Sequence, residues 1–200
     1  MDKLNDLKER LVEIIDGRTD LRPFVCDGSP LDCKVFLIGN NPATKMSTDF
    51  WDFWDSEYGF HKSAWYEAYK ADRQGEPKST SPTRERINRI VENASPVKIL
   101  ETNIYAAPTK KKADLNLEQQ TTEIFTFLLK TIRPQIIVPY GKKAVQYVQS
   151  NDIKAFIEEI KASVIPINDV TKTKKEKHLI SVSYGDACAL GAQIKRKYVA

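Results

Sequence analysis

The sequence predicts an α/β fold in which helices cover both faces of a central, mostly parallel four-stranded sheet. Four short apolar runs, each ending in turn or polar residues, are the predicted strands: 35–38, 97–103, 135–140 and 178–183. Segments with apolar residues at helical spacing separate them. Such alternation is typical of parallel sheets joined by right-handed helical crossovers. We therefore expect one three-layer α/β/α domain spanning residues 1–200.

The most informative stretch is the first apolar run, 35–38, and the turn that closes it. Gly39 permits a close backbone approach that a Cβ would obstruct, and Pro42 suits the first turn of a following helix. Ligands bind at the carboxyl ends of strands in open α/β sheets. Asn40 and Asn41 are therefore candidate site residues, although a purely structural turn also favours asparagine.

Helices are predicted wherever apolar residues recur three or four positions apart: 4–15, 82–94, 117–132, 142–148, 153–160 and a last helix that Asp186 would cap. Ser81 and Pro82 are a typical N-cap and first-turn pair. Residues 18–33 are predicted to form a loop, and 163–167 to allow a short extra strand. Three arginines off the apolar stripe of 82–94 are predicted to be solvated: Arg84, Arg86 and Arg89.

Composition favours a soluble protein of a reducing compartment, and we expect it to be cytoplasmic. The 200 residues are 41% apolar and carry a net charge of +4, which permits but does not require a polyanionic partner. Cys26, Cys33 and Cys188 are too few for a disulfide framework. With His61 and His178 far apart, no metal site and no cofactor are expected. The sequence shows no secretion signal and no membrane span.

Aromatic and basic residues gather in separate segments. Residues 50–69 hold nine of the nineteen aromatics, which either stack on bases or pack as a lid over the sheet. Lys45, Lys110 and Lys111 are candidate phosphate contacts. Lysines in loops are equally often only solvated.

Several of these motifs resemble the uracil-DNA glycosylase superfamily, and the resemblance covers nearly the whole chain. Gly39-Asn40-Asn41-Pro42 is similar to the asparagine form of that superfamily's Gly-x-(Asp/Asn/Glu)-Pro motif, found in mismatch-specific and single-strand-selective branches. Thr102-Asn103 is similar to the strand end whose asparagine reads the flipped base. Where the best-known branches place His-Pro-Ser, this chain has Ser183-Tyr184-Gly185.

The resemblance implies a uracil-DNA glycosylase-like fold and a DNA glycosylase of base excision repair. The enzyme would hydrolyse the N-glycosidic bond of uracil, or of a related damaged pyrimidine, flipped out of single- or double-stranded DNA. It would act as a monomer without metal, cofactor or membrane. The implied catalytic residues are Asn41 and Ser183. The implied base-binding residues are Gly39, Asn40, Pro42, Phe53, Trp54 and Asn103. The implied DNA-backbone contacts are Lys45, Lys110, Lys111, Tyr184 and Gly185.

Two other classes of function remain open on the sequence. The missing histidine after the last strand favours a catalytically silent member that binds nucleic acid or a base. An unrelated α/β enzyme acting on nucleotides is the second, but the chain has neither a phosphate loop nor a dinucleotide glycine pattern.

Overall fold

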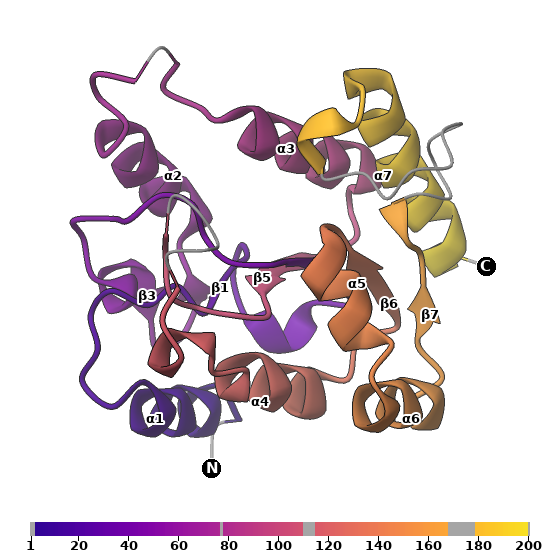
Figure 1. The fold of residues 1–200 in the computed structure, drawn as a ribbon, viewed down its shortest axis with the longest axis horizontal. Helices are drawn as coiled ribbons and strands as arrows, with labels where there is room; N and C mark the ends of the chain where they lie inside the picture. The colour runs from indigo at the N-terminus through magenta and orange to yellow at the C-terminus, as the bar shows by residue number, and fades with distance from the viewer. Residues whose placement is uncertain (1–2, 77, 110–114, 168–178, 200) are drawn as a thin grey trace.

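The computed structural model describes residues 3–76, 78–109, 115–167 and 179–199, which form a mixed sheet with helices on both faces (Figure 1). Within these residues the main sheet has five strands in the order β1-β5-β2-β6-β7. All neighbours are parallel except β1, which runs antiparallel to β5. The strands are β1 Phe24–Val25, β2 Val35–Gly39, β5 Ile99–Asn103, β6 Ile136–Pro139 and β7 Ser163–Val164, and β3 Trp54–Asp55 pairs separately with β4 Gly59–Phe60.

The helices confirm most of the predicted segments. The α-helices are α1 Lys3–Ile15, α2 Lys62–Ala71, α3 Pro82–Ala94, α4 Glu123–Ile132, α5 Lys142–Val148, α6 Asn151–Glu159 and α7 Tyr184–Val199. Short 3₁₀ helices are η1 Pro30–Asp32, η2 Phe50–Phe53, η4 Glu118–Gln120 and η6 Leu179–Ser181. The hydroxyl of Ser81 accepts the Arg84 N–H, so the predicted start of α3 is confirmed.

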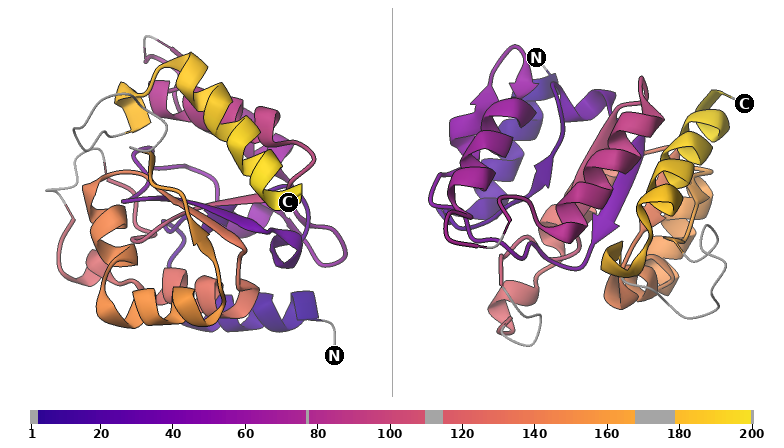
Figure 2. Two further views of the ribbon diagram at one scale, coloured as in Figure 1. Left: turned by 90° about the vertical axis from the view of Figure 1, so that its right-hand side faces the viewer. Right: turned by 90° about the horizontal axis from the view of Figure 1, so that it is seen from above.

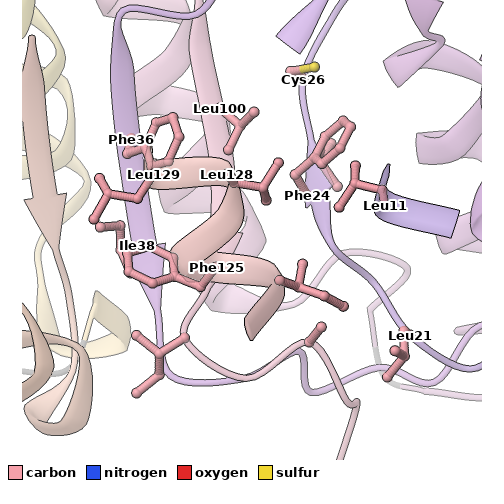
Figure 3. Close-up of a cluster of buried hydrophobic side chains, with 14 of the residues drawn as sticks. Leu11, Leu21, Phe24, Cys26, Phe36, Ile38, Leu100, Phe125, Leu128 and Leu129 are labelled. Atoms are coloured by element: carbon pink, nitrogen blue, oxygen red, sulfur yellow. The ribbon is translucent and has the colours of Figure 1, made fainter. Parts of the chain in front are cut away.

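Every residue of the central strand β2 is buried. Successive side chains of a strand point to opposite faces of the sheet, and helices cover both faces. Helices α3 and α7 cover one face, while α1, α4 and α6 cover the other (Figure 2). Val35 and Leu37 pack into the cluster beneath α3 and α7. Phe36 and Ile38 pack into the cluster beneath α1 and α4, which Figure 3 shows. The predicted α/β class with a mostly parallel sheet is therefore confirmed.

The predicted last strand, 178–183, is wrong. Residue 178 lies outside the described residues, and Leu179–Ser181 form the short helix η6. Leu179 and Val182 are buried while the two residues between them are exposed. A burial spacing of three is that of a 3₁₀ turn and not of a strand. The edge strand is instead β7, which begins the 163–167 segment and pairs in parallel with β6.

The predicted number of four strands is also wrong, because β1 lies within the segment 18–33 that was expected to be a loop. Phe24 pairs with Thr102 and Val25 with Glu101 along the outer edge of β5. Two residues are too few to show an alternating pattern in sequence. Only the free edge of β5 reveals that they form a strand.

Candidate functional site

The candidate site lies at the carboxyl edge of the sheet, where the strand order reverses around β2. The chain leaves β2 for β5 on one side and later reaches β6 on the other. In doubly wound sheets the crevice at such a reversal is where ligands bind. The parallel register pairs Gly39 with Asn103, so the predicted placement of Asn41 and Asn103 at one edge is confirmed.

Position 39 has to be glycine because two side chains at the ends of neighbouring strands lie against its Cα. A Cβ at this position would lie 2.4 Å from Oδ1 of Asn103 and 2.7 Å from the Tyr140 hydroxyl. Both contacts are far shorter than van der Waals distance. The glycine therefore lets the last side chain of β5 and the first side chain after β6 close over the end of β2.

Asn40 joins the loop after β2 to the start of α5. Its Oδ1 accepts the Ala144 N–H at 3.0 Å, which satisfies one of the free amides of the helix N-terminus. Gly141, with φ of +88°, makes room for this side chain, because a Cβ there would lie 2.9 Å from Asn40 Nδ2. The polar atoms of Asn40 thus have a structural use that the sequence did not indicate.

Asn41 is held in one orientation by its amide nitrogen. Nδ2 donates to the Thr109 carbonyl at 3.2 Å, the Thr109 hydroxyl at 3.0 Å and the Pro42 carbonyl at 3.0 Å. Two of these acceptors are carbonyl oxygens, which cannot donate, so the atom facing them must be the nitrogen. In the described part of the chain Oδ1 accepts no hydrogen bond. Asn41 therefore presents an oriented acceptor that no other described residue uses.

A cavity of about 360 Å³ opens beside this acceptor, a volume within the usual range for small-molecule sites. The first turn of α3 and the loop after β2 form its walls. The lining residues include Arg22, Asn40, Asn41, Pro42, Thr44, Tyr69, Ser81, Arg84, Tyr140 and Ile180. A second hollow, of about 490 Å³, lies near the amino end of β5, away from the strand-end asparagines.

A buried charge network borders the cavity. Glu101 of β5 is 5% exposed and forms ion pairs with Arg84 and with Lys62, the latter at 2.6 Å. Burial by itself would raise the pKa of Glu101, but the charges of Arg84 and Lys62 outweigh it and lower that pKa to about 2. The Arg84 guanidinium also lies 4.8 Å over the ring of Trp65.

The prediction that the α3 arginines are solvated is therefore wrong for Arg84, which is buried because Glu101 faces α3 from the sheet below. Arg86 donates from Nε to the Val182 carbonyl. Arg89 lies 4.4 Å over the ring of Tyr184. Arg86 is therefore half-buried, whereas Arg89 stays exposed, so the predicted solvation is confirmed for Arg89.

The predicted base-stacking aromatics do not line the cavity. Phe53 is buried in the core and packs against Phe60, with ring centroids 6.0 Å apart. Trp54 is half-buried, and its Nε1 is buried without a partner in the described residues. The cavity's aromatic residues are Tyr69 and Tyr140. Tyr140 was missed, although its place as the last residue of the predicted strand 135–140 was a usable signal.

The residues that stand where the superfamily has its histidine do not line the cavity either. Ile180 lines the cavity, but Ser183, Tyr184 and Gly185 do not. The Ser183 hydroxyl accepts the Asp186 N–H at 3.0 Å, so Ser183, and not Asp186, caps α7. The proposed backbone contact Lys45 is exposed, whereas Lys110 and Lys111 lie outside the described residues.

We expect Ser183→Ala to lower the free energy of unfolding by about 1 kcal/mol, the usual cost of removing an N-cap. The excision of uracil that the resemblance implies should not change, because the hydroxyl is used by the helix. Ser183→Asp, which keeps a capping oxygen, should restore stability. Urea denaturation measures the change in stability, and an excision assay on the same preparations measures the change in rate. A loss of excision with unchanged stability would support the catalytic role that the resemblance implies.

Fold and site together define an α/β protein with a cavity at the topological switch point of its sheet. No model of a known protein family matches the chain, and no curated protein matches it significantly. Across the ranges that the structure describes, no three His, Cys, Asp or Glu residues gather as metal ligands would. Nor does any described helix combine the length and apolar character needed to cross a membrane.

Proposed function

We propose that this protein is a DNA glycosylase that removes uracil, or a related damaged pyrimidine, after the base has been flipped out of DNA. The observation that supports this best is the oriented Asn41 amide, whose Oδ1 has no partner among the described residues, beside a cavity at the same sheet edge as Asn103. In this proposal β5-β2-β6-β7 form the four-stranded core of a uracil-DNA glycosylase-like fold, and β1 is an addition at its edge.

The chemistry suits these groups. Breaking the N-glycosidic bond builds positive charge on the sugar and negative charge on the departing base. Oδ1 of Asn41 accepts a hydrogen bond from water and holds it for attack on the sugar, so the residue acts by positioning and not as a base. The amide of Asn103 carries an acceptor and a donor that match the N3–H and O4 of uracil.

The direct test uses oligonucleotides with a single uracil, in single- and double-stranded form, scored for abasic sites by alkaline cleavage. A matched oligonucleotide with thymine in place of uracil is the control for substrate. We expect abasic sites only in the uracil strand. Their absence at stoichiometric protein, with either strand form, would contradict the proposal.

A second candidate function is binding without cleavage. No carboxylate and no histidine occurs among the described residues that line the cavity, so no group there is suited to deprotonate the water. In that case the protein would reduce the mobility of uracil-containing DNA in a gel-shift assay and would leave its glycosidic bond intact.

Asn103→Asp is expected to shift base preference from uracil toward cytosine. A carboxylate accepts from the N4 amine of cytosine, whereas it repels the O4 of uracil. Competition between uracil- and cytosine-containing oligonucleotides measures the change, with Asn116→Asp, on the exposed turn before η4, as the matched control. An unaltered preference would mean that Asn103 does not contact the base.

We further expect DNA binding to weaken linearly with salt on logarithmic axes, because lysines that contact phosphates displace counterions. Lys45→Ala should reduce the slope by about one, while Lys154→Ala on α6 should leave it unchanged. Fluorescence anisotropy at several salt concentrations measures both. Binding that does not respond to salt would contradict the assignment of Lys45.

A further inference from the structure

Arg22, in the segment between α1 and β1, is a half-buried cation that forms no ion pair with a carboxylate among the described residues. Its backbone N–H donates to the Ala106 carbonyl at 3.0 Å, which anchors it beside the strand-end loops. Its guanidinium lies 5.7 Å over the ring of Trp65, and its Nη1 is buried without a hydrogen-bond partner among those residues. Packing, and not an acid, holds this charge in place.

The charges around Arg22 do not balance. Arg84 and Lys62 already share the single carboxylate of Glu101. With Arg22 as a third cation, these four groups carry two uncompensated positive charges. Burial, and after it the charge of Arg84, lowers the pKa of Arg22 to about 10, so the guanidinium still carries its charge at neutral pH.

The cavity adjoins this excess charge. Arg22 and Arg84 both line it, and none of the described lining residues is acidic. Arg84 is committed to Glu101, whereas Arg22 has hydrogen-bonding capacity left. A ligand that carries negative charge would therefore gain most from Arg22, since hydrogen bonds between charged groups are the stronger ones.

We propose that Arg22 makes the cavity an anion site and thereby stabilises the negative charge of the departing pyrimidine. The second part of this proposal rests on the proposed glycosylase function. When the bond from C1′ to N1 breaks, its electron pair stays on the base and spreads to O2 and O4. The water oxygen bonds to C1′, and its proton leaves to solvent and finally to the base. The positive charge of Arg22 stabilises the anionic base. Ser183, whose hydroxyl caps α7, does not take this role.

Binding of small probes tests the anion site without any requirement for cleavage. Uracil is neutral at neutral pH, barbiturate is an anion with the same ring, and inorganic phosphate is an anion without one. By calorimetry we expect the parent to bind barbiturate about tenfold or more tighter than uracil. Arg22→Gln should abolish the difference and Arg22→Lys should retain part of it. Arg18→Gln is the matched control, because this arginine, four positions earlier, is partly exposed and does not line the cavity.

Each result of the binding test has a definite meaning. A parent that binds barbiturate no better than uracil, or a preference that survives in Arg22→Gln, overturns the anion site. Phosphate binding as tight as that of barbiturate overturns its assignment to a pyrimidine. Loss of the preference in Arg22→Gln, with Arg18→Gln unaffected, supports the proposal.

Cleavage of DNA with uracil or 5-fluorouracil tests the stabilisation of the leaving base. 5-Fluorouracil is the better leaving group and needs less help. Arg22→Gln should therefore lose about a hundredfold in single-turnover rate with uracil, and clearly less with 5-fluorouracil. An equal loss on both substrates overturns the role of Arg22. A parent that cuts neither substrate overturns the proposed function and the leaving-group role together, and the binding test then decides the anion site separately.

Discussion

Glu101→Gln is expected to lower the free energy of unfolding by about 3–5 kcal/mol, the usual cost of removing one partner from a buried ion pair. Arg84 would lose its carboxylate while remaining buried between α3 and the sheet, and Lys62 would lose its partner at 2.6 Å. Urea denaturation at neutral pH measures the loss. The matched control is Glu67→Gln, which removes an exposed pair with Lys70 of the same 2.6 Å length and should cost less than about 1 kcal/mol.

The same carboxylate makes stability depend on pH in a defined range. The difference between its ordinary pKa of 4.5 and about 2 in the fold corresponds to about 3 kcal/mol. A carboxyl whose pKa is lowered by folding stabilises the fold fully above its unfolded pKa. This contribution is therefore present above about pH 5 and is lost as the pH falls toward 2. Glu101→Gln should flatten that part of the stability curve, and an unchanged acid transition would contradict the assignment.

If the protein is the proposed glycosylase, Asn41→Ala is expected to reduce excision of uracil by about a hundredfold or more, because the attacking water would lose the oriented acceptor Oδ1. DNA binding should persist. The hydrogen bonds from Nδ2 to Thr109 and Pro42 are lost as well, so stability should fall by about 1–3 kcal/mol. Single-turnover rates measured well below the denaturation midpoint separate the two effects.

Thr109→Val is the matched control for the role of orientation. It removes the hydroxyl acceptor of Asn41 but leaves the two carbonyl acceptors. A loss intermediate between the parent and Asn41→Ala would show that the direction of the amide matters. If Asn41→Ala cuts as fast as the parent, Asn41 does not position the water.

The features that the sequence determined are local ones. A continuous apolar run closed by Gly39 and Pro42 specifies a buried strand followed by a turn, because both signals lie within a few residues. Ser81 and Pro82 mark the start of α3 for the same reason. The shared edge of Asn41 and Asn103 also followed from sequence, because parallel strands joined by helices must end on the same side of the sheet.

The tertiary structure decided what depends on partners distant in the chain. Phe24–Val25 form a strand only because β5 offers a free edge. Arg84 is buried only because Glu101, seventeen residues later, faces it from the sheet. Asn40 and Asn41 are adjacent, alike in sequence and both line the cavity, yet Asn40 accepts from the start of α5 while Asn41 donates to Pro42 and Thr109. Arg22 reaches the site because packing of the loops around β1 and β5 brings it there, and no local pattern encodes that position.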